Sequence, residues 1–450
     1  MSDYDAIVIG AGPAGEHCAF SLARGGLRVA IVERGLVGGE CDYWACIPSK
    51  TLLRPGEALH HAKEAPGARE AVTGPLDVEA ALGWRDFMVS GYDDSGKVST
   101  LDDAGIDLLR GSAHIAGTGT VEIDGTAHTA THIVIATGSD PVIPPIPGLR
   151  EAEGVWTNRE VTGMKEVPKR MLVLGGGPVG VEMAQAVARM GSSVALVEGM
   201  EHLLPREPRR LGEALAQALE MDGIELCFGQ HASGVRRDGD EYVLSFPERE
   251  DLRGDKLLVA TGRRPRTEGI GLETVGIEPG ERGEVVVDEY LSAGENLWAI
   301  GDVAGIWPLT YVGKYEGRVV ASNILGTPRK ANFEAVPRVV FTDPQAASVG
   351  APEGEVEVTA QLKDVPRTAT FTRAYAEKPG FMTLVSDGER ITGAYALGPE
   401  AGEWLQQATL AIRAGVPLEV MQDTIQPFPT FSEVFLHALT ELGDRVPAAA

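Results

Sequence analysis

The chain has 450 residues, more than the roughly 250–300 that a single hydrophobic core serves, so we expect several domains. Hydrophobic residues make up 43% and charged residues 23% of the sequence, no apolar run approaches the ~18 residues of a membrane span, and no export signal opens the chain, which favours a soluble cytoplasmic protein. The net charge of −25 repels phosphate backbones and anionic lipid surfaces, so we expect small-molecule partners, no nucleic acid and no membrane.

Two segments of equal length repeat one pattern. Residues 10–33 and 175–198 align without a gap, and about half of the positions are identical. Each follows a short apolar strand, at 6–9 and 171–174, and continues as G-x-G-x-x-G, an alanine-rich helix and a valine-rich strand that ends in an acid. This is the pattern of a dinucleotide-binding unit, and two copies in the same context are poorly explained by tight turns without a ligand. The sequence therefore predicts two dinucleotide sites.

The glycines and acids of the two units have distinct expected roles. The glycines allow a tight turn, let the backbone approach a pyrophosphate and let the helix pack on the strand, while the helix N-terminus supplies amide donors. The terminal acids, Glu33 and Glu198, are expected to bind ribose hydroxyls. The glycines are Gly10, Gly12 and Gly15 in the first unit and Gly175, Gly177 and Gly180 in the second.

The sequence has four cysteines, too few for a secreted disulfide scaffold. Two of them stand in an unusual sequence context. Cys18 and Cys227 lie on segments typical of a buried helix and a buried strand, and packing explains both. Cys41 and Cys46 follow a pair of glycines and precede Ile-Pro-Ser-Lys, with no nearby Cys or His at the spacing of a zinc site. We therefore favour redox chemistry for this pair and expect no metal site.

Two further strands end in the same tripeptide. The strand at 131–136 leads into Ala-Thr137-Gly138, and the strand at 256–259 leads into Ala-Thr-Gly262. Each comes after its own dinucleotide unit, so we expect each to close its domain.

Asp302 follows a short strand that begins at Leu297 and precedes a helix expected at 311–325. This position suits a contact to a sugar hydroxyl chain, although a simple turn residue explains Asp302 equally well. The proline-rich segment 141–147 and the segment 327–333 are typical of linkers.

The C-terminal part of the chain has a different pattern. Residues 336–398 alternate as strands do, and helical patterns follow at 401–414 and 431–442. The sequence therefore predicts an α/β fold class with two Rossmann-like dinucleotide-binding domains and a C-terminal α+β domain.

The order of these motifs across essentially the whole chain resembles the pyridine nucleotide-disulfide oxidoreductases of the lipoamide dehydrogenase, glutathione reductase and mercuric reductase type. The most specific match is Gly38-Gly39-x-Cys41-x4-Cys46-Ile-Pro-Ser-Lys50. The resemblance implies FAD on the first unit, a nicotinamide cofactor on the second, Asp302 on the flavin ribityl chain and a homodimer. The implied domains are an FAD-binding domain at 1–145 and 265–330, an NAD(P)-binding domain at 146–264 and a dimerisation domain at 331–450.

The same resemblance assigns roles at the redox centre. Cys46 is expected to lie against the isoalloxazine as a charge-transfer thiolate, and Cys41 is expected to be the exposed thiol that attacks the substrate. Cys46 just precedes a helix expected to start at Pro48, where the helix dipole favours a thiolate. Lys50 is expected to pair with Glu182 beside the flavin, and a solvated lysine is the alternative.

Glu198 also bears on the choice of nicotinamide. A carboxylate there accepts a hydrogen bond from a free 2′-hydroxyl and repels a 2′-phosphate, so we expect NADH to be preferred. NADPH stays possible because Arg206, Arg209 and Arg210 follow closely.

Three residues around the cysteines depart from the family pattern. Glu40 stands where a small hydroxyl residue usually precedes the first cysteine, and Tyr43 and Trp44 add bulk between the two cysteines. We therefore expect altered access to Cys41.

A larger departure lies near the C-terminus. Residues 427–433 resemble the segment in which disulfide reductases carry a catalytic histidine five residues before a glutamate, reaching across the dimer. Glu433 is present, but Phe428 occupies the histidine position. General acid–base catalysis typically contributes ~10²–10⁴-fold, so turnover of a dithiol should fall accordingly. His437, about one helical turn beyond Glu433, is a conceivable substitute base, but a surface or packing role is favoured.

These observations favour an enzyme that passes electrons from nicotinamide through FAD and the cysteine pair to a small acceptor, such as a quinone, a metal species or a disulfide. One alternative is a lipoamide-type disulfide reductase with a substitute base. Another is the carboxylating 2-ketopropyl-coenzyme M enzyme, which has phenylalanine at this position but matches neither Glu433 nor the short N-terminus. Mercuric reductase is disfavoured because no cysteine pair lies near the C-terminus and no metal-binding module precedes residue 1. A non-enzymatic redox sensor is least favoured, because the cysteine pair, Lys50 and Glu182 are retained.

Overall fold

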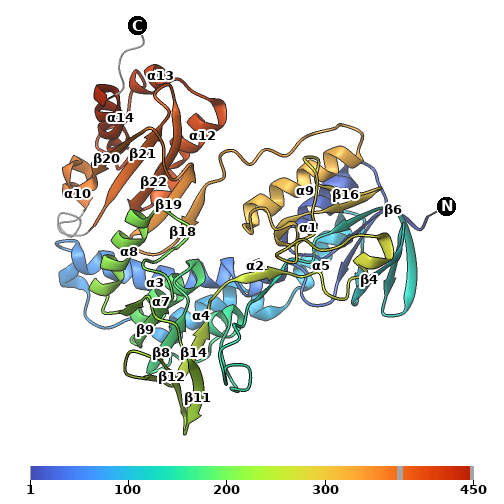
Figure 1. Cartoon of the computed structure of the whole chain (residues 1–450), viewed down its shortest axis with the longest axis horizontal. Coiled ribbons are helices and arrows are strands. Elements are labelled where there is room, and N and C mark those ends of the chain that lie inside the picture. The colour runs from blue at the N-terminus through green and yellow to red at the C-terminus, as the bar shows by residue number, and fades with distance from the viewer. Residues whose placement is uncertain (1, 372–378, 446–450) are drawn as a thin grey trace. The chain divides into compact units, whose positions relative to one another are not determined.

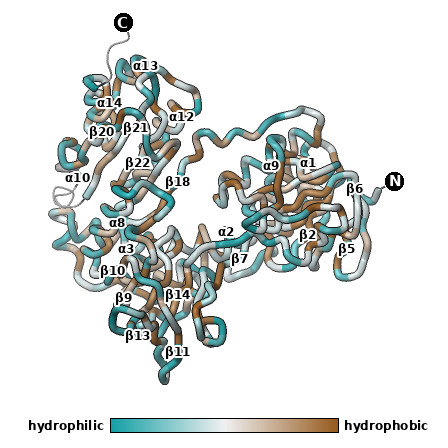
Figure 2. Tube along the Cα trace, viewed as in Figure 1, coloured by the Kyte–Doolittle hydropathy of each residue, from teal (hydrophilic) through white to brown (hydrophobic). Residues whose placement is uncertain are grey.

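The computed structural model describes residues 2–371 and 379–445, and the chain forms two compact units (Figure 1). Figure 2 shows that hydrophobic residues follow the strands inside each unit, as expected for sheets with covered faces. Within the described residues, no helix is both long and apolar enough to cross a lipid bilayer. The first unit comprises Met1–Pro48, Gly83–Val142 and Gly262–Asn332, and the second comprises Ser49–Leu82, Ile143–Thr261 and Phe333–Ala450.

The first dinucleotide-binding repeat forms the centre of the sheet in the first unit. Its strands β1 (Tyr4–Ile9) and β2 (Val29–Glu33) pair in parallel. They are joined by helix α1 (Pro13–Arg24), which begins at a proline because the first helical N–H needs no partner. The strand order is β16-β17-β6-β1-β2-β3, so two later strands of the chain, β6 (Thr126–Ile135) and β17 (Leu297–Ala299), lie side by side in this sheet.

Helix α9 (Thr310–Ile324) packs closely on α1. A Cβ atom at Gly317 would lie 2.8 Å from the backbone oxygen of Ala14 and 3.0 Å from the backbone nitrogen of Cys18, so glycine is required for this approach. The other elements of this unit are β3 (Ile106–Arg110), β4 (Ala113–Gly117), β5 (Thr120–Ile123), β7 (Ser139–Pro141), β15 (Arg263–Pro265), β16 (Ser292–Gly294), α2 (Gly39–Tyr43) and α5 (Ser95–Asp103). The chain passes from one unit to the other within helices α3 (Cys46–Glu64) and α4 (Val78–Met88).

The second repeat has the same arrangement in the second unit. Strands β8 (Arg170–Leu174) and β9 (Ser193–Glu198) pair in parallel and are joined by helix α7 (Pro178–Arg189), again with a proline at its start. The expected closing strand is β14 (Lys256–Val259), and the parallel order is β10-β9-β8-β14. The expected pair of Rossmann-like folds is therefore confirmed.

The C-terminal part of the second unit is an antiparallel sheet of order β18-β19-β22-β21-β20 with helices packed on it, which confirms the expected α+β region. The helix expected at 401–414 is divided at Leu405, whose side chain is fully buried in this core. The helix expected at 431–442 begins at Glu433, whose carboxylate accepts a hydrogen bond from the backbone N–H of Thr430 just before the helix.

The second unit contains further short elements that complete its sheets and surface. They are β10 (Glu225–Phe228), β11 (Gly234–Asp238), β12 (Glu241–Ser245), β13 (Leu252–Gly254), β18 (Arg338–Val340), β19 (Gln345–Gly350), β20 (Val356–Gln361), β21 (Phe381–Ser386), β22 (Ile391–Gly398), α6 (Asn158–Thr162), α8 (Arg209–Met221), α10 (Pro366–Phe371), α11 (Ala401–Trp404), α12 (Gln406–Ala414), α13 (Leu418–Gln422) and α14 (Glu433–Arg445).

Candidate active site

The first glycine loop has the geometry that a pyrophosphate requires. A Cβ atom at Gly10 would lie 2.3 Å from the backbone oxygen of Ala136, and one at Gly15 would lie 1.9 Å from that of Gly10, so packing within the protein excludes side chains there. A Cβ atom at Gly12 would meet nothing within 4 Å. Gly12 therefore leaves open space beside the N-terminus of α1, where a dinucleotide phosphate fits.

The second glycine loop repeats this geometry. A Cβ atom at Gly175 would lie 2.5 Å from the backbone oxygen of Ala260, and one at Gly180 would lie 1.9 Å from that of Gly175. A Cβ atom at Gly177 would meet nothing within 4 Å. The two dinucleotide-binding repeats therefore offer the same geometry for two dinucleotides.

The acids at the ends of the second strands are anchored to these loops. Glu33 accepts hydrogen bonds from the backbone N–H groups of Ala11 at 2.9 Å and Gly35 at 2.7 Å. Glu198, only 8% exposed, accepts hydrogen bonds from the N–H groups of Gly176 at 2.7 Å and Met200 at 2.8 Å. The carboxylates expected to bind ribose therefore also fix the shape of their own loops.

Asp302 lies in a buried polar cluster of the first unit. Its carboxylate accepts a hydrogen bond of 2.5 Å from the hydroxyl of Ser139, which in turn accepts one of 2.8 Å from Arg263. The neighbouring Gly301 N–H donates to Glu316, a fully buried carboxyl whose pKa burial raises to about 8. Asp302 therefore belongs to a polar network with Ser139 and Arg263, and Glu316, which was not expected from the sequence, lies beside it.

The two Ala-Thr-Gly segments both use glycine for backbone conformation. Gly138 and Gly262 have φ angles of +77° and +134°, which side chains disfavour. The hydroxyl of Thr137 donates to the backbone oxygen of Arg266 at 2.7 Å. These residues shape the turn after each closing strand.

Cys41 and Cys46 lie together in the first unit, and both are half-buried. A hydrogen bond with Cys46, followed by burial, raises the pKa of Cys41. The Cys46 sulfur also lies 3.2 Å from the hydroxyl of Thr310, the first residue of α9. Thr310 was not expected from the sequence, because only the fold brings it to Cys46.

Helix α3 begins at Cys46, whereas the sequence analysis placed Cys46 just before the helix. Pro48 falls within the first turn, where no N–H is needed for a backbone hydrogen bond. Cys46 therefore lies at the positive end of the helix dipole, which stabilises a thiolate.

The segment between the cysteines is held from several sides. Lys97 forms ion pairs with Asp42 at 2.5 Å and with Glu16 at 3.1 Å. Trp44 stacks on Tyr92 with ring centroids 4.4 Å apart. The unusual bulk between the cysteines is therefore packed against another part of the first unit.

Glu40, the other departure beside Cys41, also has a partner in the first unit. Its carboxylate lies 3.9 Å from the guanidinium of Arg263, the same side chain that binds Ser139. Glu40 is therefore linked to the polar cluster around Asp302.

Lys50 and Glu182 form an ion pair of 2.7 Å in the second unit. The Glu182 side chain is 6% exposed, and its second oxygen accepts a hydrogen bond of 2.9 Å from the backbone N–H of Phe341. The Lys50 ammonium lies 4.6 Å from the centre of the Phe341 ring. Phe341, which the sequence analysis missed, therefore contacts both members of the pair.

The C-terminal segment differs from what a histidine base would require. Phe428 is 71% exposed, and Glu433 is 8% exposed with one oxygen accepting the Thr430 N–H at 3.2 Å. His437 lies on the exposed side of α14. Over the described part of the chain, no group of three or more His, Cys, Asp or Glu residues has the arrangement of a metal site.

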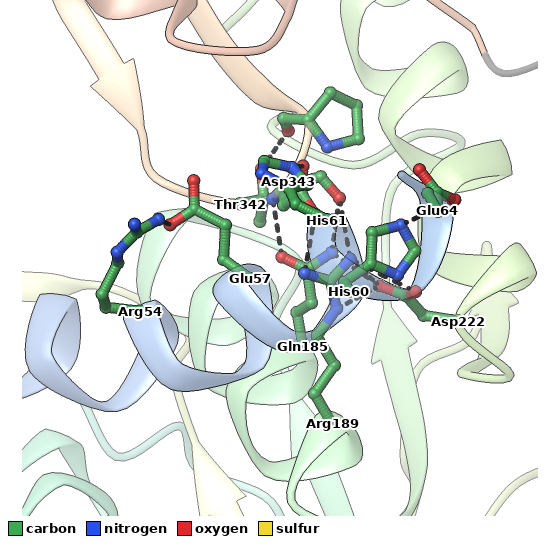
Figure 3. Close-up of polar contacts among 11 residues, drawn as sticks. Arg54, Glu57, His60, His61, Glu64, Gln185, Arg189, Asp222, Thr342 and Asp343 are labelled. Atoms are coloured by element: carbon green, nitrogen blue, oxygen red, sulfur yellow. Dashed lines mark hydrogen bonds and ion pairs between the residues drawn. The ribbon is translucent and has the colours of Figure 1, made fainter. Parts of the chain in front are cut away.

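A buried polar cluster surrounds Asp343 in the second unit (Figure 3). The Asp343 carboxylate contacts His61 at 3.1 Å and Arg189 at 2.8 Å, and Arg189 also pairs with Asp222 at 3.0 Å. Burial opposes ionisation of Asp343, but the hydrogen bond from His61 and the charge of Arg189 outweigh it and hold the pKa of this carboxyl well below its ordinary value. The hydrogen bond to Asp343 in turn raises the pKa of His61.

We expect the His61 contribution to stability to depend on pH. The folded-state pKa is raised above the ordinary 6.5, so the stabilisation is complete below that pH and is lost as the pH rises through the folded-state pKa. His61→Gln should cost on the order of 1 kcal/mol at about pH 5.5 and much less at about pH 9. Thermal unfolding at both pH values measures this, with the exposed His437→Gln as control. An equal loss at the two pH values contradicts the assignment.

Comparison with known proteins agrees with this geometry. The family model "Pyridine nucleotide-disulphide oxidoreductase" matches residues 4–317, and the dimerisation domain of that family matches residues 336–439. Dihydrolipoyl dehydrogenase of Thermus scotoductus is 37% identical and aligns over 98% of this chain and 98% of its own length. Mercuric reductase of Bacillus cereus is 34% identical over 96% of this chain and 70% of its own length.

A solved structure shows the same likeness in three dimensions. The Cu(II) complex of the HOCl-induced flavoprotein disulfide reductase RclA from Escherichia coli matches with a TM-score of 0.86 and 28% identity, over 98% of this chain and 100% of that chain. The chain therefore belongs to the pyridine nucleotide-disulphide oxidoreductases, FAD-dependent enzymes that take electrons from NAD(P)H.

Proposed function

We propose that the protein passes electrons from NADH through FAD and the Cys41–Cys46 pair to a small acceptor that needs no proton from a histidine. The observation that carries this proposal is Phe428, an exposed aromatic residue where disulfide reductases place their catalytic base. An apolar side chain neither donates nor accepts a proton, so the acceptors best served are quinones and oxidised metal ions. Bound FAD would supply the two-electron relay between nicotinamide and sulfur.

The residues of the chain divide the work of this proposal. Gly12 and Glu33 bind FAD, with Asp302 on its ribityl chain, while Gly177 and Glu198 bind the nicotinamide dinucleotide. We propose the domains expected from the sequence, with residues 331–450 closing a homodimer, and the match of residues 336–439 to a dimerisation domain supports the homodimer. A thiol pair that cycles with its disulfide also suits a reducing compartment, so we place the protein in the cytoplasm.

The chemistry of the acceptor step balances without a histidine. The reduced pair gives up two electrons as its sulfurs join, and its remaining protons go to the solvent. Two Cu(II) ions take one electron each, or one quinone takes both electrons with two protons from water. The RclA structure in complex with Cu(II) supports a metal species as one acceptor class.

A lipoamide-type disulfide reductase is the second candidate. The likeness to the dihydrolipoyl dehydrogenase of Thermus scotoductus favours it. A lipoamide-type reductase needs another base near the thiols, and His437 is the candidate that the sequence offers. Steady-state assays with NADH and a panel of quinones, Cu(II), lipoamide and glutathione disulfide separate the two. Turnover confined to the disulfides would reject the first proposal.

We expect kcat/KM for NADH to exceed that for NADPH by about tenfold, because the Glu198 carboxylate opposes a 2′-phosphate. Two of the nearby arginines are engaged, since Arg209 pairs with Glu201 and Glu213 and Arg210 stacks over Phe381. Steady-state kinetics with both cofactors measure the ratio.

The control for this preference is a second glutamate. Glu198→Gln should reduce the ratio, whereas the exposed Glu220→Gln on α8 should leave it unchanged. A lower KM for NADPH with equal kcat in the wild type contradicts the preference.

A further inference from the structure

The segment of residues 341–344 binds along one face of α7. Glu182 accepts the Phe341 N–H at 2.9 Å. One turn on, Gln185, which is fully buried, accepts the Asp343 N–H at 2.8 Å and donates to the Asp343 backbone oxygen at 2.8 Å. One further turn on, Arg189 donates to the Asp343 carboxylate at 2.8 Å. Side chains from three successive turns of α7 therefore fix the position of this segment.

Helix α3 meets the same segment at two points. Lys50 and His61 lie about three turns apart, and therefore on the same face of α3. Lys50 pairs with Glu182 at 2.7 Å. His61 binds the Asp343 carboxylate at 3.1 Å, as Figure 3 shows. The carboxylates of Glu182 and Asp343 therefore join α3 to α7 and to the segment. Glu182 does so through its pair with Lys50, and Asp343 does so within the buried cluster.

We infer that Asp343 is a positioning residue for the Lys50–Glu182 pair. The Asp343 carboxylate is held by His61 of α3 and Arg189 of α7. The backbone two residues earlier is fixed as a result, and it presents the Phe341 N–H to Glu182 at a defined place. That N–H and Lys50 occupy the two oxygens of Glu182 and leave it a single orientation. The inference rests on the proposed electron path, in which the pair lies beside the flavin.

The loss of the Asp343 charge has a defined consequence. Arg189 is 11% exposed, and within the described part of the chain the carboxylate left to pair with it after the loss of Asp343 is that of Asp222, so the arginine is drawn away from the segment. His61 loses its anionic partner at the same time. The two backbone hydrogen bonds of Gln185 remain, but the segment loses one of its attachments to α7, so the Phe341 N–H is held less firmly against Glu182 and Lys50 is less well fixed. Even a small displacement of a group at a reacting centre slows the chemical step.

The test compares Asp343→Asn with Asp222→Asn. Both substitutions remove one buried carboxylate from Arg189, but only Asp343 belongs to the segment that contacts Glu182. Stopped-flow reduction of the flavin by NADH gives a limiting rate and a Kd. We expect Asp343→Asn to lower the limiting rate on the order of tenfold with little change in Kd, because the second glycine loop is untouched. Asp222→Asn should leave both within about twofold of the wild type.

A second variant keeps the test decisive if Asp343→Asn fails to fold. His61→Gln retains a polar side chain and the backbone contacts of Gln185, and it should lower the limiting rate in the same direction by a smaller factor. Equal slowing in the Asp343 and Asp222 variants, or an unchanged rate in Asp343→Asn, overturns the inference. Failure of the wild-type flavin to accept electrons from NADH overturns the proposed function instead, so the two failures are distinct.

Discussion

In the Cys46→Ser variant, we expect two-electron reduction to leave no long-wavelength absorbance band, whereas the reduced wild type shows one. The band requires a thiolate donor against the flavin, and a serine hydroxyl neither ionises near neutral pH nor closes a disulfide with Cys41. Turnover of acceptors that depend on the cysteine pair should be abolished together with the band. Anaerobic titration with dithionite, followed by absorbance, is the measurement.

Cys41→Ser is the matched control for this experiment. It removes the partner thiol but leaves Cys46 beside the hydroxyl of Thr310, so the band should persist while turnover is lost. Cys18→Ser, at a buried position whose thiol pKa burial raises to about 12, should change neither. A band that survives in Cys46→Ser shows that the roles of the two cysteines have been misassigned.

The wild type should be a weak lipoamide dehydrogenase, and Phe428→His should partly repair it. General acid–base catalysis typically supplies ~10²–10⁴-fold, so we expect dihydrolipoamide turnover to be lower than in an ordinary lipoamide dehydrogenase by about that factor. In the proposed homodimer, Phe428 would bring an apolar group to Cys41 of the other subunit, which would disfavour charge there and slow thiol–disulfide interchange more than flavin reduction. Dihydrolipoamide turnover and NADH-driven flavin reduction, measured separately, distinguish the two steps.

The repair at Phe428 should be incomplete. One oxygen of Glu433 is engaged with the Thr430 N–H at the start of α14, so the carboxylate is not wholly available to orient a new histidine. Ile425→His is the matched control, because Ile425 is 94% exposed on the same segment. Wild-type turnover within a few-fold of an ordinary lipoamide dehydrogenase means that the base lies elsewhere.

The parts of the fold that the sequence predicted depend on local rules. The G-x-G-x-x-G motifs and the prolines at the starts of α1 and α7 determine strand, turn and helix within one short segment, and both repeats form as expected. The break at Leu405 was not predictable from periodicity, because the apolar pattern continues through this buried residue. Helix ends shift by a few residues, as at Glu433, because the hydrophobic pattern does not define the terminal residue of a helix.

The candidate site was predictable where the residues carry a motif and unpredictable where the fold alone brings them together. Cys41, Cys46 and Lys50 stand in one short segment, and Glu182 follows the second glycine motif. Thr310 reaches the Cys46 sulfur only because α9 returns beside the first repeat.

Phe341 and Asp343 likewise reach α7 only through long-range packing of the second unit. Neither residue carries a local signal of its own in the sequence. The contacts that orient the Lys50–Glu182 pair therefore became visible only in the structure.

The most direct measurement of the central claim is the decay of the long-wavelength band of the enzyme after anaerobic reduction with one equivalent of NADH. The reduced enzyme is mixed in a stopped-flow instrument with a quinone, Cu(II) or oxidised lipoamide. The account predicts rapid decay with the quinone or Cu(II) and decay at least about tenfold slower with lipoamide, because Phe428 supplies no proton. Rapid decay with lipoamide, and none with the other two acceptors, would contradict the account.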